Sequence, residues 1–202
     1  MLFHRPLATV TPTLDGDVLA VLAQADAAFT TGQLHRMLTE RSEEGIRRVL
    51  HRLVDQGVVT ADGAGNAWLY RLNRQHLAAD AIIALANLAA TLIDRLEAEV
   101  ALWSVLPRYA AVFGSAARAT MTAESDIDVL LIQPDDGDVA RWDTQVARMA
   151  SDVTRWTGND CHPLVYGEIE LHAAEEAVLA EIALHGLTIA GEREWFTRQL
   201  RR

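Results

Sequence analysis

Apolar residues recur at helical spacing three times in the first part of the chain. The first run covers 14–22, and the second covers 32–38 behind two threonines that can cap a helix. The third run lies between Ser42 and Gly57, with glutamates in its first turn. Its i, i+3, i+4, i+7, i+8 stripe consists of Ile46, Val49, Leu50, Leu53 and Val54. The pattern predicts three helices, of which the third has one well-defined apolar face.

The face of the third helix opposite this stripe is basic. It carries Arg47, Arg48, His51 and Arg52, and Arg41 comes just before the cap. After the helix, apolar-rich segments at 58–60 and 68–72 flank the turn-forming residues 62–66. That arrangement predicts a β-hairpin directly after the three helices.

The remaining chain alternates helical and strand patterns. Residues 75–103 contain neither Gly nor Pro and predict one long helix, which Pro107 ends. Strands are predicted at 109–113, 129–132, 161–166 and 187–191, with helices at 139–156 and 173–185. We therefore expect an α+β protein with a domain at 1–74, a connecting helix at 75–106 and a small mixed-sheet domain at 107–202.

Charge is distributed unevenly over the 202 residues. The formal net charge is −10, and all eighteen basic residues are Arg. Residues 1–75 hold eight Arg and eight acids, whereas residues 76–202 hold ten Arg and twenty acids. The total excludes a uniformly basic nucleic-acid binder, and the absence of Lys excludes a lysine nucleophile. The split suggests two modules with different partners.

The single cysteine and the apolar runs bear on location. Cys161 alone permits no internal disulfide, and the first residues lack the basic start and unbroken apolar run of a secretion signal. Charged residues or Asn interrupt the apolar stretches before the ~18 residues that a membrane span needs. We expect a soluble, cytoplasmic protein without a membrane partner.

Chemistry-bearing residues gather around two of the predicted strands. Gly114 and Ser115 end the first of them, Arg118 follows, and Ser125-Asp126-Ile127-Asp128 leads into the second. Strand alternation puts Asp126 and Asp128 on one face, where they can hold the same hard cation. Gly114 allows phosphates to approach the backbone closely, and Ser115 supplies a hydroxyl and free N–H groups.

The N-terminal pattern resembles a known family. Residues 31–72, with "SEEGIRRVLHRLVDQG" running into "VVT", resemble a bacterial winged helix-turn-helix regulator domain. The resemblance implies that the third helix enters the DNA major groove and that the hairpin touches the backbone. The DNA contacts would come from Arg41, Arg47, Arg48, His51 and Arg52. The same basic face also fits a solvated surface or a protein-binding module.

The stretch "FGSAARATMTAESDIDVLLI" closely resembles the signature of polymerase-β-like nucleotidyltransferases, especially the minimal nucleotidyltransferases. The resemblance implies that Asp126 and Asp128 are catalytic and ligate two Mg²⁺ or Mn²⁺ ions. The triphosphate of a bound NTP would be held by Gly114, Ser115, Arg118 and Ser125. The implied reaction transfers a nucleoside monophosphate to a hydroxyl acceptor. The family further implies an antitoxin-like role toward a partner toxin, and the winged helix suggests a homodimer.

Two positions depart from the family pattern. Ala119 stands where a Gly usually follows the motif's Arg. A third carboxylate is expected on a later strand, yet the register of 161–166 that we favour puts His162 there. Asp160 shares its face, and Glu168 is a more distant candidate. Because neutral His is a poor Mg²⁺ ligand, the alternative is a transcriptional regulator whose inactive transferase domain senses a nucleotide.

Overall fold

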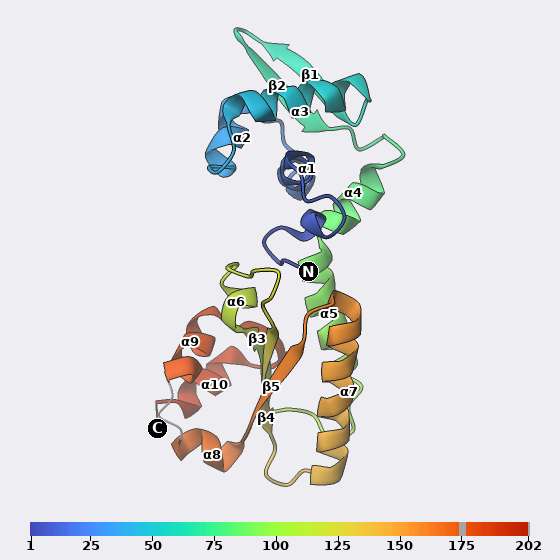
Figure 1. The fold of residues 1–202 in the computed structure, drawn as a ribbon. Coiled ribbons are helices and arrows are strands. Elements are labelled where there is room, and N and C mark those ends of the chain that lie inside the picture. The colour runs from blue at the N-terminus through green and yellow to red at the C-terminus, as the bar shows by residue number, and fades with distance from the viewer. Residues whose placement is uncertain (174–176, 202) are drawn as a thin grey trace. The chain divides into compact units, whose positions relative to one another are not determined.

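The computed structural model describes residues 1–173 and 177–201 and divides the chain into two compact units. The first, called here the helical unit, is Arg5–Ala89. The second, called the sheet unit, comprises Ala90–Arg202 together with Met1–His4. Their secondary structure is labelled in Figure 1. Among the helices of the described residues, none combines the length and apolar composition that a membrane crossing requires.

The helical unit contains the helices and the hairpin in the order expected from the sequence. A short 3₁₀ helix at Pro6–Thr9 precedes the regular elements. These are α1 (Leu14–Gln24), α2 (Thr31–Met37), α3 (Glu43–Asp55), β1 (Val59–Ala64), β2 (Ala67–Leu72) and α4 (Ala79–Ala86). All of them contribute to one apolar core.

The local sequence explains where α2 and α3 begin. The Thr30 hydroxyl accepts the Gln33 N–H, and the Gln33 side chain accepts the Thr30 N–H in return. The Ser42 hydroxyl accepts the N–H of Gly45 at the start of α3. The stripe of α3 then faces the core, where Ile46 and Leu50 are completely buried.

The hairpin is longer than the sequence pattern indicated. Residues 62–64, which we expected in the turn, pair with β2, and the register runs from Val59↔Leu72 to Ala64↔Ala67. Only Gly65 and Asn66 remain as the connection, and Gly65 has a φ of +60°. A two-residue turn with a left-handed glycine matches the twist of paired strands, so backbone pairing continues to the tip.

The prediction of a single long helix at 75–103 is wrong. The structure has two helices, α4 and α5 (Leu88–Val100), separated at Asn87. Asn87 takes φ −99° and ψ 12°, and its N–H donates to the carbonyls of both Ile83 and Ala84, which tightens the last turn of α4. Asn has a lower helix propensity than the surrounding Ala and Leu, because its side chain competes for backbone hydrogen bonds.

A four-stranded mixed sheet forms the centre of the sheet unit and confirms the predicted α+β class with a small mixed sheet. The strands are β3 (Tyr109–Phe113), β4 (Ile127–Gln133), β5 (Cys161–Gly167) and β6 (Leu187–Gly191), in the spatial order β5-β4-β3-β6. β3 is antiparallel to both β4 and β6, whereas β4 and β5 are parallel.

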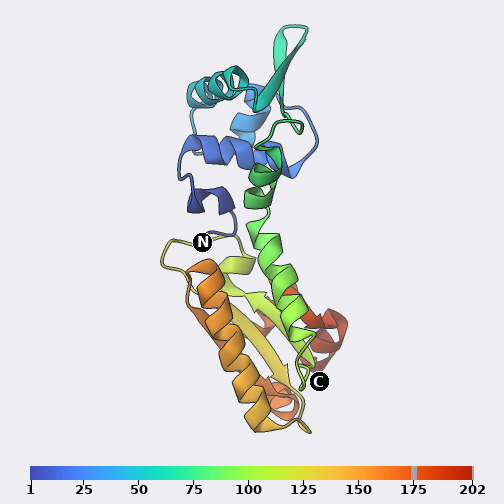
Figure 2. The same ribbon diagram turned by 90° about the vertical axis from the view of Figure 1, so that its right-hand side faces the viewer.

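Helices cover both faces of this sheet. Figure 2 shows α5 beside α7 (Val139–Thr157) on one face. The opposite side carries α6 (Gly114–Ala117), α8 (Glu168–Ala173), α9 (Ala177–His185) and α10 (Arg193–Gln199) (Figure 1). Part of the helix predicted at 173–185 lies outside the described residues, and α8 and α10 were not predicted. Tyr109 of β3 stacks on Phe196 of α10, with ring centroids 4.5 Å apart, in the apolar core of this side.

Candidate functional site

Three chain segments meet at one edge of the sheet. β3 ends at Phe113, which pairs with Asp128 near the start of the antiparallel β4. β5 runs parallel to β4 and begins at the same edge, with Asp128 opposite His162. The topology therefore brings residues from around positions 114, 126 and 162 together.

Gly114 is required by its neighbour across the strands. Its φ is +67°, and a Cβ at this position would overlap the carboxylate oxygen Oδ2 of Asp128. Any larger residue would be strained in its backbone and would displace that carboxylate. The absence of a side chain thus keeps the Asp128 carboxylate in place against the turn.

Asp126, Asp128 and His162 come together at this edge, which is called here the acidic edge. The Nδ1 atom of His162 lies 3.4 Å from Oδ2 of Asp126, and the two side chains are 62% and 42% exposed. Burial raises the pKa of Asp128, and the nearby Asp126 charge raises it further, whereas His162 and Arg118 lower it. The two carboxylates therefore repel each other across a partly buried position.

The two carboxylates fit a hard divalent cation. Such an ion prefers oxygen ligands, and Mg²⁺ commonly uses one or two carboxylates together with substrate phosphates. A cation would also offset the repulsion that acts on Asp128. The imidazole of His162 does not suit Mg²⁺. Across 1–173 and 177–201, the structure contains no group of three or more His, Cys, Asp or Glu side chains arranged around a metal site.

The other two candidates for the third acid lie differently. Asp160 precedes β5 and is exposed, and its backbone carbonyl accepts the Ile127 N–H at 2.8 Å. Glu168 follows β5 at the opposite end of the sheet, where it pairs with Arg108 at 3.1 Å. Glu168 therefore cannot complete the site, because the full length of β5 lies between it and the end of the sheet that holds Asp126 and Asp128. The register places the His162 backbone beside Asp128.

The remaining predicted nucleotide ligands lie in α6, at its end and in the turn before β4. Ser115 lies in the short helix α6, and Arg118 caps its end and forms an ion pair with Glu181 of α9. The Ser125 hydroxyl accepts the Thr122 N–H at 2.8 Å and so closes the turn before β4. Arg118 and Ser125 are thus both engaged within the protein.

Ala119 adopts a left-handed backbone conformation. Its φ is +58°, and it is the one non-glycine residue with positive φ in the part of the chain that the structure describes. This conformation disfavours a Cβ. The position is the one where the transferase signature has Gly, so the departure seen in the sequence carries a local backbone cost.

Asn159 is a residue at this edge that sequence reasoning missed. It is 4% exposed, and its Nδ2 donates to the Ser125 carbonyl at 2.8 Å. Its Oδ1 accepts from the Met1 amine, which also donates to the Thr157 carbonyl at 3.1 Å. The signal in the sequence was weak, because an Asn after a helix-ending Gly is ordinary turn chemistry.

Cys161 has no catalytic character in this environment. It is buried, and burial, reinforced by the Asp128 charge, raises the pKa of its thiol to about 12. Because the thiolate is the reactive form, the side chain acts as a small apolar residue.

The five residues predicted to contact DNA divide into two groups. Arg41 donates to Asp17, which also pairs with Arg5, so it is held below the cap of α3. The other four side chains, those of Arg47, Arg48, His51 and Arg52, are exposed on α3. Two of them form ion pairs, Arg47 with Glu43 and Glu44, and Arg52 with Asp15.

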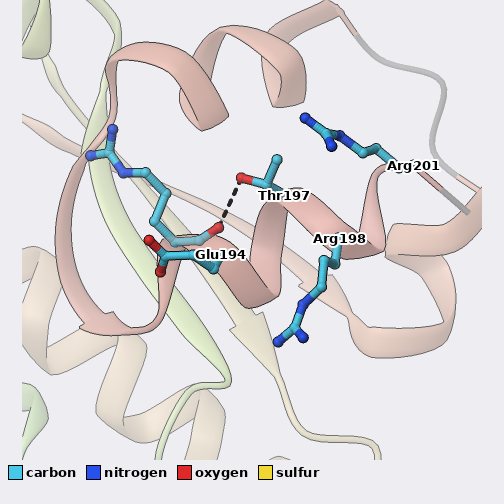
Figure 3. Close-up of a pocket in the computed structure, with 5 residues that line it drawn as sticks. Glu194, Thr197, Arg198 and Arg201 are labelled. Carbon is cyan, nitrogen blue, oxygen red and sulfur yellow. Dashed lines mark hydrogen bonds between the residues drawn. The ribbon is translucent and has the colours of Figure 1, made fainter.

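Two of the open hollows in the described part of the chain are lined without Asp126, Asp128 or His162. One, of about 420 Å³, lies between α2, α3 and β2 in the helical unit and is lined by Arg47, His51 and the exposed Trp68. The other, of about 460 Å³, follows α10 in the sheet unit (Figure 3). It is lined by Arg193, Glu194, Thr197, Arg198 and Arg201. Within it, the Thr197 hydroxyl donates to the Arg193 carbonyl at 2.8 Å.

Comparison with known families assigns the domain that contains this edge. Residues 93–184 match the family model described as "Nucleotidyltransferase domain". This range includes the signature around Gly114 and Asp126, so the comparison supports a nucleotidyltransferase domain at residues 93–184. No curated protein shows significant sequence similarity to the chain.

Solved structures give a weaker likeness. One is a crystal structure of a toxin–antitoxin with AMP-PNP, which is 21% identical, with a TM-score of 0.36 over 52% of this chain and 84% of that chain. Another is a mutant of the toxin–antitoxin MntA–HpeT, 17% identical, with a TM-score of 0.37 over 55% and 83%. At these scores neither structure extends the assignment beyond the domain.

Proposed function

We propose that the sheet unit transfers a nucleoside monophosphate from an NTP to a hydroxyl acceptor. The observation that carries this proposal is the pair of carboxylates on Asp126 and Asp128, held at one sheet edge beside the side-chain-free Gly114. The match of residues 93–184 to the nucleotidyltransferase domain supports it. The alternative, a domain that binds a nucleotide without turning it over, predicts the same binding but no transfer.

Each residue has a defined part in this proposal. Asp126 and Asp128 hold one or two divalent cations, which supply charge stabilisation for the oxygens that attack and leave. Gly114 leaves room for the Asp128 carboxylate next to the backbone, and Ser115 offers a hydroxyl to the phosphates. His162 contacts Asp126 and orients its carboxylate. Arg118 balances charge near Asp128 while it pairs with Glu181.

The proposed reaction is an in-line displacement at phosphorus. The acceptor hydroxyl oxygen forms a bond to the α-phosphorus. The bond between that phosphorus and the oxygen that bridges the α- and β-phosphates breaks. Pyrophosphate leaves with the bonding electrons, and the hydroxyl proton passes to water. The protein contributes mainly by holding the reacting groups in line.

Label transfer tests this proposal. The purified chain is incubated with each α-³²P-labelled NTP, Mg²⁺ or Mn²⁺, and separated protein, RNA and small-molecule fractions of a bacterial lysate. We expect label in one fraction with the wild type and none with Asp126→Asn/Asp128→Asn. A matched control, Asp136→Asn/Asp143→Asn, removes two exposed acids of the same unit and should retain transfer.

The outcomes separate the alternatives. Transfer that survives the Asp126/Asp128 double substitution contradicts the site. Metal-dependent NTP binding without any transfer favours the nucleotide-sensing regulator. The Asp160→Asn variant distinguishes the two readings of the third position, because it should retain full transfer if the exposed Asp160 takes no part. The toxin partner, the antitoxin-like role and the homodimer stay predictions from the resemblance.

We also propose that the helical unit is a winged helix that binds DNA through α3. The favouring observation is that Arg47, Arg48, His51 and Arg52 are all exposed on the face opposite the buried stripe. Next to them, the hollow between α3 and β2 carries the exposed Trp68. Arg48 and His51 are the side chains best placed to contact bases, since Arg47 and Arg52 are paired with acids.

A gel shift with DNA from upstream of the chain's own gene tests this second proposal. Arg47→Ala/Arg48→Ala should weaken binding and reduce the slope of log K against log salt, because two positive charges are removed from the surface proposed to face DNA. Arg141→Ala/Arg148→Ala, which removes two exposed arginines of the sheet unit, should leave the slope unchanged. An unchanged slope in the α3 variant contradicts the assignment.

A further inference from the structure

We propose that Asn159 is a positioning residue for the acidic edge, which it stabilises by fixing the peptide group that leads into Asp126. The proposal rests on the proposed transferase function. Asn159 lies in the loop between α7 and β5, and it is the one buried polar residue among those that the structure describes. A buried amide is costly unless its donors and acceptors are used.

The contacts of Asn159 are directed at both sides of its loop. Its backbone N–H donates to Thr157 Oγ1 at 3.1 Å, and its Oδ1 accepts from the Met1 amine. With Oδ1 so used, Nδ2 faces the Ser125 carbonyl at 2.8 Å. The orientation of the amide is thereby set by its partners on each side.

The Ser125 carbonyl belongs to the peptide plane that also contains the Asp126 N–H. Because that plane is rigid, a hydrogen bond to the carbonyl restricts the backbone at Asp126. In the peptide group that follows Asp126, the Ile127 N–H donates to the Asp160 carbonyl at 2.8 Å. Two consecutive residues of one loop therefore hold the peptide groups before and after Asp126.

These two contacts differ in how they depend on the sequence. The contact from Asp160 uses only its backbone, so any residue at that position can supply it. The contact to Ser125 uses the Asn159 side chain and requires an N–H donor. Asp126 itself precedes β4 and lies outside the strand pairing. The Asn159 side chain is therefore the sequence-dependent support of the backbone at Asp126, and through it of the carboxylate position relative to Asp128.

The test replaces the donor and keeps the shape. Asn159→Asp retains an acceptor for the Met1 amine but turns an oxygen toward the Ser125 carbonyl. We expect the transfer rate to fall about tenfold and the Mg²⁺ concentration for half-maximal rate to rise about tenfold, while higher Mg²⁺ restores most of the rate. Rescue by metal is a readout that a merely structural role would not produce.

A matched control lies in the helical unit. Asn73 Nδ2 donates to the Gly57 carbonyl, also at 2.8 Å. Asn73→Asp should lower thermal stability by a similar amount and leave the rate and the Mg²⁺ requirement within about twofold of wild type. If Asn159→Asp does not fold, Asn159→Ala is measured instead, at a temperature where circular dichroism shows it folded.

The outcomes also separate this inference from the proposed function. A folded Asn159 variant with the rate and Mg²⁺ requirement of the wild type overturns the inference. A wild type that neither binds nor transfers a nucleotide overturns the proposed function instead. In that case, amide hydrogen exchange decides the positioning role: faster exchange at Ser125 and Ile127 in Asn159→Asp supports it, and unchanged exchange overturns it.

Discussion

The two units use charged side chains in opposite ways. On α3 of the helical unit, Arg47 pairs with Glu43 and Glu44, one turn away on the same exposed face. In the sheet unit, Asp126 just before β4 and Asp128 within β4 lie near His162 of β5, and the Asp128 carboxyl is partly buried. The first arrangement joins solvent-exposed side chains that are close in the sequence. The second joins side chains that are far apart in the sequence and are brought together by strand pairing.

This difference determines what a substitution should do in each unit. Exposed ion pairs contribute little to stability, typically 0.2–1 kcal/mol, so the α3 face can change with little effect on folding. A partly buried acid next to another acid is held in an unfavourable state by the surrounding fold. Function and stability should therefore oppose each other at the two acids of the sheet unit and vary independently on the α3 face of the helical unit.

Asp128→Asn should show this opposition most strongly. We expect transfer to fall about 1000-fold, because one ligand of the proposed metal site is lost. The free energy of unfolding at pH 7 should rise, because the folded state no longer holds a carboxylate whose pKa is raised by burial. The stability gain should disappear at a pH below the ordinary Asp pKa of 3.8, where the wild-type carboxyl is protonated in both states.

Urea unfolding over a pH series and label transfer measure both sides of this prediction. Arg48→Ala serves as the control from the helical unit, and we expect it to change neither quantity. A variant Asp128→Asn that loses both stability and transfer would contradict the opposition.

Gly114→Ala should have the next largest effect. The new Cβ meets the Asp128 carboxylate and also forces a positive φ on an alanine. We expect a loss of about 2–4 kcal/mol of unfolding free energy, together with loss of transfer. Gly65→Ala isolates the backbone contribution, because Gly65 has φ +60° with open space around it, and should cost about 1 kcal/mol. Equal losses of unfolding free energy in the two variants, measured by chemical unfolding, would show that the overlap between the new Cβ and the Asp128 carboxylate has no cost.

Glu99→Met should stabilise the sheet unit. Both carboxylate oxygens of Glu99 are shielded from solvent and lack a hydrogen-bond partner among the described residues. Burial raises the pKa of Glu99, and Asp152 adds to the rise, whereas Arg148 and Arg155 oppose it. We expect a gain of about 1–2 kcal/mol at pH 7.

The pH dependence of this gain has a definite sign. A carboxyl whose pKa is raised by folding destabilises the protein once it ionises. The benefit of Glu99→Met should therefore be smallest below the ordinary Glu pKa of 4.5 and grow as the pH rises through the raised value. Glu97→Met, an exposed change on the same helix, should stay within about 0.5 kcal/mol of wild type at every pH. A gain that does not vary with pH would show that ionisation is not its cause.

Ala119→Gly should have the smallest effect and a stabilising one. Glycine relieves the left-handed conformation at φ +58°, and we expect a gain of about 0.5–1 kcal/mol in thermal or urea unfolding. Ala117→Gly, two residues earlier in α6, replaces a helical alanine and should destabilise by a similar amount. The same sign for both variants would contradict the assigned conformation of Ala119.

Much of the helical unit follows from local sequence. The apolar stripe of α3 and the caps at Thr30 and Ser42 are short-range signals, and each appears in the structure as expected. The hairpin tip and the break at Asn87 were harder to predict. Both depend on whether backbone pairing or helical hydrogen bonding continues through residues that tolerate either conformation.

The site shows the same division. The Gly-Ser and Ser-Asp-x-Asp motifs mark the chemistry because they lie within about twenty residues and on adjacent elements. The placement of His162 opposite Asp128 needed the parallel register of β4 and β5, which a shift of one residue would reverse. The distance between Glu168 and this edge likewise follows from the direction of β5.

The sequence by itself determined the three helices before the hairpin, where the charges divide, and that residues 114–128 resemble a nucleotidyltransferase signature. Those features depend on periodicity and on residues close in the chain. Only the tertiary structure decided that His162 approaches Asp126, that Glu168 lies at the far end of the sheet, and that Asn159 holds the turn before Asp126. These contacts join residues more than thirty positions apart, and strand pairing and burial bring them together.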